Sequence, residues 1–365
     1  MVDYLVSLTI WTALYAIFAL GLNLQWGFTG LINFGHVAFA TIGAYTTAIL
    51  TLQGVPIAIA AIIGAALASL LGLLIGTSTL RLREDYLAIV TIGVSELIRL
   101  VALNEEWLTK GAFGVQRYPL PLDIEPNIIV KLLIIAVFTG VAIFAFWQLW
   151  RAFGKGLRSS SETKGGNKFV IIWAALAGFL VLGLYINGLI ALSDYNYKGG
   201  LMVVSLVILA LVYGGLEFIA HSPWGRILKA IREDEEIPRA LGKNVFWYKL
   251  QSLMLGGAIA GLSGALLAWQ LTTIYPTNFE PLLTFNAWII VILGGSGNNA
   301  GTLLGALIFW TYDSLTRFAL PYFKIMNDSQ AGSFRIMVIG LILMVLMVWR
   351  PQGILGNKDE LTLGR

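Results

Sequence analysis

The stretch VPIAIAAIIGAALASLLGLLIGTSTL, residues 55–80, contains no charged side chain. A transmembrane helix needs about 20 consecutive apolar residues to cross the hydrocarbon core of a bilayer. Strands of a membrane barrel instead alternate apolar and polar residues over about ten positions, and this stretch does not alternate. We therefore predict that residues 55–80 form a membrane-spanning helix.

The composition of the whole chain extends this prediction. Of the 365 residues, 58% are hydrophobic and 12% are charged, and the mean hydropathy is +0.80. Soluble globular proteins carry about 25% charged residues, so the composition excludes a soluble core of this size. The chain has no cysteine, which excludes disulfides, thiolate sites and cysteine-ligated metals. The opening residues MVDY lack a basic n-region, and we expect no cleavable signal peptide.

Similar apolar runs recur along the chain. We predict an all-α polytopic membrane protein with about eleven transmembrane helices, some of them short or broken, in a single transmembrane domain over residues 1–350. The predicted spans lie near residues 4–24, 30–52, 55–80, 86–103, 127–150, 169–192, 199–220, 249–272, 283–296, 302–318 and 334–349.

The two shortest spans, 283–296 and 302–318, flank the glycine-rich run GGSGNNAGTLLGA. Glycine at this density lets helices break or pack closely. Interrupted helices often line the pathway in transporters, which makes Gly294, Gly295 and Gly297 candidates for a translocation pathway. A tight turn between two short helices explains the same glycines equally well.

Basic residues mark one side of the membrane. The loops after the third, fifth and seventh spans, and the C-terminal end, are richer in Lys and Arg than the loops between them. The positive-inside rule places such loops in the cytoplasm, so the net charge of +4 reflects orientation rather than nucleic-acid binding. With eleven spans the N-terminus then faces out and the C-terminus in, and residues 351–365 form a cytoplasmic tail.

The loop predicted at residues 151–168, RAFGKGLRSSSETKGGNK, is rich in Ser, Gly and Lys. Such a composition is typical of a flexible, solvated segment, and we expect a flexible cytoplasmic loop. It is either a plain linker or a regulatory insertion.

Charge is most concentrated in HSPWGRILKAIREDEEIPRALGKNVFWYKL, residues 221–250. Ser222 and Pro223 predict a helix start, apolar residues follow at helical spacing, and Gly242 predicts a helix end. We expect one or two short amphipathic helices under the membrane between residues 221 and 248. Mixed charge suits a protein-docking surface better than a lipid anchor. The alternative is a charged loop that only sets topology.

This segment resembles the cytoplasmic coupling segment of ABC importer permeases of the branched-chain amino acid family. In that family the segment carries a degenerate Glu-Ala-Ala…Gly signature and seats in a groove on the ATPase subunit. The matching positions here are Gly225, Arg226, Ala230, Ile231, Arg232, Glu233, Glu235, Ala240, Leu241, Gly242 and Lys249. Pro238 departs from the pattern, which commonly has a small helical residue there, and this departure bears on helix geometry rather than on docking.

Other segments are similar to the same family, in chain order over nearly the whole sequence. They are GLNLQWGFTGLINFGHVAFATIGAYTTAIL from Gly21, LREDYLAIVTIGVSELIR from Leu82, LTKGAFGVQ, GGAIAGLSGALLA from Gly256, ILGGSGNNAGTLLGA from Ile292 and WRPQGILG from Trp349. In LTKGAFGVQ, Lys110 replaces a glycine of the family pattern. The resemblance favours the longer of the family's two permease types and is weakest near residues 151–200.

The resemblance implies a permease subunit of an ABC importer in the bacterial inner (plasma) membrane. It would move branched-chain or other neutral amino acids by ATP-driven alternating access. Implied partners are a second permease subunit, expected to be a shorter homologue, two ATP-binding cassette ATPases and an extracytoplasmic substrate-binding protein. The chain has no G-x-x-x-x-G-K-[ST] phosphate loop. We therefore expect no cofactor here, with ATP and Mg bound by the ATPases, and no enzymatic activity.

Polar side chains inside predicted spans are costly and often functional. Asn33 and His36 stand three residues apart in the second span, and we expect them on one helical face. They either contact the substrate along its path or bond neighbouring helices. Because the chain has only 2 histidines, we expect no metal site and no catalytic constellation.

Carboxylates also occur within spans. Glu96 and Arg99 are placed to form an ion pair that offsets the cost of burial, and Glu96 is alternatively a candidate for the translocation pathway or a proton relay. Asp313 and Arg317 repeat the pattern, and Glu217 lies near a span end. These carboxylates leave a self-contained ion-coupled transporter open as an alternative. A urea or short-amide permease of the same family is a second alternative, and a membrane enzyme is the class that the sequence supports least.

Overall fold

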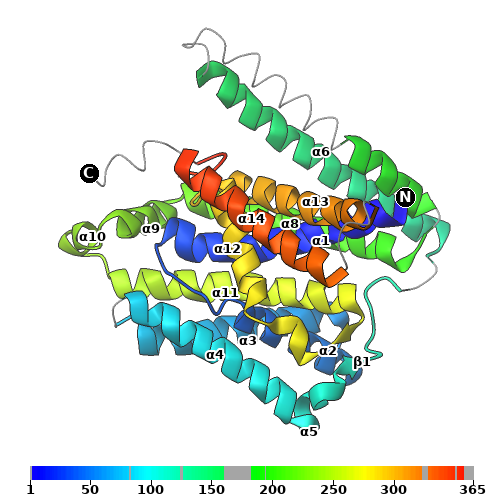
Figure 1. Cartoon of the computed structure of the whole chain (residues 1–365), viewed down its shortest axis with the longest axis horizontal. Coiled ribbons are helices and arrows are strands. Elements are labelled where there is room, and N and C mark those ends of the chain that lie inside the picture. The colour runs from blue at the N-terminus through cyan, green and yellow to red at the C-terminus, as the bar shows by residue number, and fades with distance from the viewer. Residues whose placement is uncertain are drawn as a thin grey trace. The chain divides into compact units, whose positions relative to one another are not determined.

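The structure, a computed structural model, describes residues 2–81, 84–123, 126–159, 182–193, 195–322, 328–349 and 352–356. These residues form helices joined by loops, together with one antiparallel pair of short strands, β1 (Val115–Gln116) and β2 (Thr273–Ile274) (Figure 1). Within them, seven helices are long and apolar enough to cross a membrane, and shorter apolar helices accompany these. The chain is therefore an all-α polytopic membrane protein, as predicted, while the span count and the orientation stay predictions.

The chain divides into two compact units, one of Met1–Trp11 and Pro121–Leu211 and the other of Thr12–Leu120 and Val212–Arg365. The helices are α1 (Val2–Leu22), the π-helix η1 (Asn23–Phe28), α2 (Val37–Leu52), α3 (Ile57–Thr79), α4 (Glu84–Asn104), α5 (Glu106–Thr109), η2 (Gly111–Phe113), α6 (Ile128–Ser159), the helix Leu182–Ser193, α8 (Tyr197–His221), α9 (Pro223–Glu233), α10 (Glu236–Ala240), α11 (Val245–Leu271), η4 (Pro276–Phe279), α12 (Leu282–Gly294), α13 (Asn299–Tyr322) and α14 (Asp328–Trp349).

The smaller unit packs α6 against the helix Leu182–Ser193. Phe138 and Tyr185 stack with ring centroids 5.5 Å apart, and the Lys131 ammonium donates to the carbonyl oxygen of Ser193. Tyr195, in the loop before α8, donates to the Leu122 carbonyl oxygen over 2.9 Å. Burial raises the pKa of the Tyr195 hydroxyl from its ordinary value.

Helix α6 is longer than the predicted fifth span and continues to Ser159. The prediction of a loop from residue 151 is therefore wrong for its first part, and residues 160–168 lie outside the described residues. The physical reason is that the strong helix formers in LWRAFGKGLRS outweigh two isolated glycines, each of which costs only about 1 kcal/mol in a helix.

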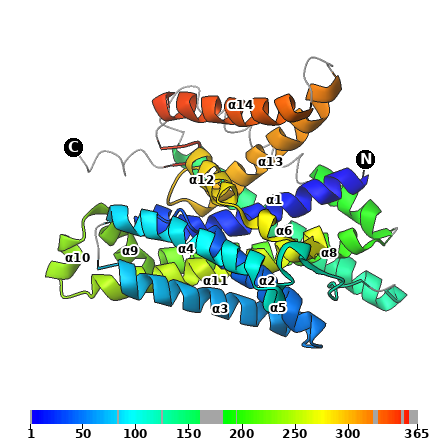
Figure 2. The same cartoon turned by 60° about the horizontal axis from the view of Figure 1, so that its bottom comes forward.

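Helix α11 is the centre of the larger unit and lies alongside α2 and α3 (Figures 1 and 2). Glycines on α11 allow backbone-to-backbone contact. A Cβ added at Gly264 would lie 2.0 Å from the carbonyl oxygen of Ala40 on α2, and one added at Gly261 would lie 2.6 Å from the Cβ of Ala68 on α3. Interfaces between membrane helices favour small residues because close backbones maximise van der Waals contact.

The predicted second span, 30–52, is helical only from Val37 onward. Before it, η1 ends at Phe28, and the chain crosses to α2 without regular structure. Gly35 in this connection lies against α4, since an added Cβ would be 1.8 Å from the Thr91 carbonyl oxygen. The span is thus a broken helix, which places its polar residues in a connection rather than on a helical face.

We predict that Gly264→Ala destabilises the protein by about 1–3 kcal/mol, because the methyl group would overlap the α2 backbone. Gly93→Ala on α4 is the matched control, since nothing lies within 4 Å of its added Cβ, and it should leave stability unchanged or slightly raised. Thermal unfolding of the purified variants in detergent measures both. Equal melting temperatures for the two variants would contradict the close-contact interpretation.

Candidate functional site

The predicted coupling segment, residues 221–248, forms the two helices α9 and α10. The side chain of Ser222 caps α9 by accepting from the Gly225 amide at 3.4 Å. The chain turns extended at Asp234, with φ −159°. The Asp234 carboxylate then accepts from the Glu236 amide at 2.8 Å and starts α10. The Ser222 cap therefore defines the start of α9, and the Asp234 side chain just before the N-cap Glu235 fixes the start of α10.

Pro238 fits this geometry without loss. It occupies the third position of α10 and is buried. Amide groups in the first turn of a helix have no acceptor within that helix, so a residue without an N–H group removes no hydrogen bond there. The departure of Pro238 from the family pattern therefore leaves a helix in place.

Gly242 ends α10 as predicted. Its φ of +74° is left-handed, its amide donates to the Arg239 carbonyl oxygen at 3.0 Å, and the Lys243 amide donates to the Pro238 carbonyl oxygen at 3.0 Å. This pair of bonds is the Schellman arrangement, which satisfies the last carbonyls of a helix.

One face of the segment is packed on the protein. Leu228 and Ile231 are buried, and a Cβ added at Gly225 would lie 2.5 Å from the carbonyl oxygens of Ile219 and Ala220. Glu235 forms an ion pair with Lys249, which is buried on α11. The segment is therefore held to the membrane-embedded helices at both of its ends.

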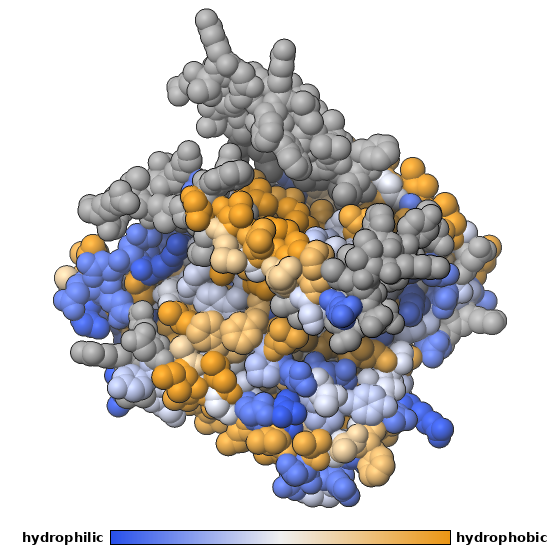
Figure 3. Space-filling model, in the orientation of Figure 1, coloured by the Kyte–Doolittle hydropathy of each residue, from blue (hydrophilic) through white to orange (hydrophobic). Residues whose placement is uncertain are grey.

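The other face is open. Leu241 and Ile237 are 74% and 57% exposed, and charged residues surround them (Figure 3, hydrophilic patch over α9 and α10). The predicted coupling residues divide between the two faces: Arg226, Glu233, Ala240, Leu241 and Gly242 are exposed, Ala230, Arg232 and Glu235 are intermediate, and Gly225, Ile231 and Lys249 are buried.

Asn33 and His36 do not share a helical face, because residue 33 lies in the connection and His36 directly precedes α2. Both are fully buried. The Asn33 amide donates to Gln25 Oε1 at 2.8 Å, and its Oδ1 accepts from the Gly35 amide at 2.9 Å. His36 Nε2 lies 3.1 Å from the Phe18 carbonyl oxygen. These contacts support the alternative in which the two residues bond neighbouring segments.

The predicted ion pairs are formed. Arg99 Nε donates to Glu96 Oε2 at 2.9 Å on α4, where Glu96 is 38% exposed. On α13 the Asp313 carboxylate binds Arg317 at 2.9 Å and Arg335 of α14 at 3.3 Å. Neither carboxylate is left without a cationic partner.

Gly294 ends α12, and Gly295 and Gly297 lie in the turn between α12 and α13, both with positive φ. The segment after α14 binds this turn. The Ile354 and Leu355 amides donate at 3.0 Å to the carbonyl oxygens of Leu293 and Gly294. Both motifs resemble the family in sequence, but no sequence pattern indicates that one binds the other.

The π-helix η1 was also missed, although it contains a cluster of buried amide side chains. Asn23 and Gln25 are both fully buried. Asn23 contacts the α12–α13 turn, and Gln25 Nε2 donates to the Leu253 carbonyl oxygen of α11 at 3.1 Å. Two buried amides close together in an apolar segment were the available signal, because such groups need hydrogen-bond partners.

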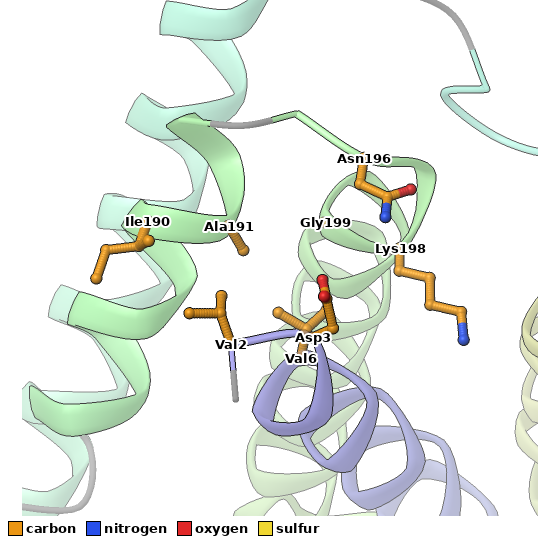
Figure 4. Close-up of a pocket in the computed structure, with 8 residues that line it drawn as sticks. All are labelled: Val2, Asp3, Val6, Ile190, Ala191, Asn196, Lys198 and Gly199. Atoms are coloured by element: carbon orange, nitrogen blue, oxygen red, sulfur yellow. The ribbon is translucent and has the colours of Figure 1, made fainter.

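A cavity of about 320 Å³ lies in the smaller unit, between the start of α1, the helix Leu182–Ser193 and the start of α8 (Figure 4). Asp3 and Lys198 place opposite charges on its wall, and Val2 and Val6 make it partly apolar. Its polar lining residues Asp3, Asn196 and Lys198 are exposed, so the cavity is a surface hollow to which we assign no ligand. Within the described residues, no group of three His, Asp or Glu residues is placed to hold a metal ion.

The known proteins that this chain resembles are permeases of branched-chain amino acid transport. The family model described as branched-chain amino acid transport system / permease component matches residues 4–347. The LivM permease protein of the Escherichia coli high-affinity branched-chain amino acid transport system is 29% identical over 94% of this chain and 68% of its own length. A probable LivM protein of Methanocaldococcus jannaschii is 23% identical over 99% of this chain and 96% of its own length.

A LivH permease protein of Salmonella typhimurium is 22% identical over 94% of this chain and 92% of its own length. No solved structure matches the chain. The matched region runs from α1 into α14 and includes the coupling segment, the broken helix and the α12–α13 turn. The chain therefore belongs to the branched-chain amino acid permease family of ABC transporters, in which it resembles the LivM type, and it is a multi-pass protein of the inner membrane.

Proposed function

We propose that the chain is the translocation subunit of an ABC importer that moves branched-chain or other neutral amino acids inward by ATP-driven alternating access. It hydrolyses no ATP itself. The observation that carries the proposal is the two-helix segment 221–248, which is anchored on one face and open on the other. On this proposal the segment lies in the cytoplasm and docks on an ATP-binding cassette ATPase.

The open face has the character of a docking surface. Ile237 and Leu241 lie one turn apart and expose apolar side chains among charges. Covering each of them is worth about 1.5–3 kcal/mol. The surrounding mixed charges supply specificity and orientation more than affinity. The capped helix ends keep the segment in one shape before a partner arrives, which lowers the entropic cost of binding.

The partners follow from the family. LivM and LivH relatives of this chain are both named as permease proteins of branched-chain amino acid transport. We infer that this chain pairs with a shorter LivH-like permease, and that two ATPases and an extracytoplasmic binding protein complete the importer. Selection by the binding protein would let the pathway itself remain weakly specific. The cargo names of the relatives favour neutral aliphatic amino acids over urea or short amides.

An ion-coupled mechanism has less support. A coupling carboxylate must release its ion or proton during each cycle. Glu96 is already paired with Arg99, and Asp313 is paired with both Arg317 and Arg335. Each carboxylate would have to break these pairs to exchange a proton.

We expect Leu241→Asp to reduce recovery of ATPase subunits with the tagged chain at least about tenfold, because it places a charge in the apolar centre of the docking face. Leu355→Asp is the control: Leu355 is 46% exposed and lies outside the segment. Gentle detergent purification followed by mass spectrometry measures the recovery. If the native chain never retains ATPase subunits, the importer proposal fails, and if both variants retain them, the docking face lies elsewhere.

The left-handed conformation at Gly242 generates a further expectation. A Cβ there costs about 1–2 kcal/mol, and less for Asn, while the space around Gly242 is open. Gly242→Ala should therefore weaken the affinity for purified ATPase subunit about fivefold or more, and Gly242→Asn by less. Titration of the subunit onto the permease in nanodiscs measures both. Equal loss with Ala and Asn would mean that side-chain size, rather than backbone conformation, matters at this position.

A further inference from the structure

The side chain of Arg232, on α9 of the coupling segment, contacts the membrane-embedded part of the larger unit. Its Nη1 donates to the carbonyl oxygen of Gly27 in η1 at 2.5 Å. One turn earlier on α9, the Lys229 ammonium lies 5.4 Å from the centroid of the Phe28 ring. Two consecutive turns of α9 therefore contact the same end of the π-helix, and a cationic group makes each contact.

Gly27 is the point where this contact meets the α12–α13 turn. A Cβ added at Gly27 would lie 2.1 Å from Asn23 Oδ1 and 2.5 Å from the Gly297 amide nitrogen. No other residue fits this position without displacing both neighbours. Because these elements are packed at backbone contact, a shift of the Gly27 carbonyl must move Asn23, the turn or both.

Asn23 links η1 to the α12–α13 turn and to the start of α13. Its Oδ1 accepts from the Gly297 amide at 2.9 Å, and its Nδ2 donates to Asn299 Oδ1 at 3.2 Å. The Asn299 amide in turn donates to Glu217 Oε2 at 3.2 Å. Glu217 lies one turn before the end of α8, the helix that leads directly into the coupling segment.

The contacts thus form a closed ring. The covalent chain runs from Glu217 through α9 to Arg232. The return path consists of the hydrogen bond from Arg232 to Gly27, the close packing of Gly27 against Asn23 within η1, and the hydrogen bonds from Asn23 to Asn299 and from Asn299 to Glu217. A movement of α9 relative to α8 cannot be absorbed within the segment alone. It must break a bond of the ring or move η1 and the α12–α13 turn.

We propose that Arg232 is a positioning residue that transmits movement of the docked coupling segment to η1 and to the α12–α13 turn, through Gly27 and Asn23. The inference rests on the proposed function, since it needs an ATPase to move the segment. It assigns docking and transmission to different residues: Ile237 and Leu241 face the partner, while Arg232 faces the π-helix. The two roles are therefore separable by substitution.

The test uses the complete transporter, with its second permease, ATPases and binding protein, reconstituted in liposomes. Uptake of radiolabelled leucine and ATP hydrolysis are measured on the same preparation. Arg232→Met keeps the length and apolar stem of the side chain and removes its donors. We expect recovery of ATPase subunits and ATP turnover to stay within about twofold of native, while leucine uptake per ATP hydrolysed falls at least about tenfold.

Two further variants sharpen the result. Arg232→Lys retains a cationic donor and should restore part of the uptake-to-ATP ratio, which a merely structural role would not require. Arg117→Met is the control for loss of an arginine, because Arg117 is exposed in the loop between α4 and α6, and it should leave the ratio unchanged.

The outcomes are distinguishable. A native uptake-to-ATP ratio in Arg232→Met overturns the transmission role of Arg232. Loss of ATPase subunits from Arg232→Met also overturns it, because Arg232 would then act in docking, and the proposed function would stand. Failure of the native chain to hold ATPase subunits would instead contradict the proposed function itself.

Discussion

A broken helix inside a bilayer is possible only where protein groups satisfy the backbone that the break sets free, since lipid offers no hydrogen-bond partners. In this chain the break lies between η1 and α2, and buried side chains supply those partners. Asn33 binds the Gly35 amide, Thr284 accepts from the Val37 amide at 2.9 Å, and Trp288 donates to the Asn33 carbonyl oxygen at 3.1 Å. The arrangement of α2, α12 and the coupling segment around η1 follows from this requirement.

The same requirement explains why polar side chains are so unevenly distributed. Exposed faces of α3 carry Ile and Leu, as lipid contact demands. Buried amide and imidazole side chains concentrate instead where the chain leaves regular helix, at η1, in the following connection and at the α12–α13 turn, whereas the polar residues buried within regular helices are mostly Ser and Thr. A buried polar side chain inside the membrane is thus as good an indicator of irregular backbone as of contact with cargo. Asn33 and His36 are examples, because both bind protein groups near the break.

Much of the fold could be predicted from local pattern. Helix class followed from run length and composition, and the ends of the coupling helices followed from Ser222 and Gly242, whose side-chain and backbone preferences act within a few residues. The break before Val37 could not be predicted from apolar run length, because no Asp, Glu, Lys or Arg interrupts residues 30–52. The extension of α6 to Ser159 was missed for the opposite reason, since charged residues continue a helix as readily as apolar ones.

In the candidate site too, local features could be predicted from the sequence and long-range contacts could not. The resemblance of residues 225–249 to a coupling segment and the exposed position of Leu241 were accessible from sequence. The contact of Arg232 with Gly27 joins residues about 200 positions apart, and no short-range rule brings them together. The same holds for Asn23 and Asn299, whose pairing depends on helices packed by the whole unit.

The binding of residues 352–356 to the α12–α13 turn also constrains biogenesis. A chain made from its N-terminus inserts α12 and α13 before α14 has been synthesised, and at that stage the carbonyl oxygens of Leu293 and Gly294 lack the amides of Ile354 and Leu355 that later bind them. Domains generally fold from the N-terminus during synthesis, but this turn is completed only after residues 352–356 have been synthesised. The turn, and with it the ring through Asn23, therefore folds late. Its completion requires that α14 has already been synthesised.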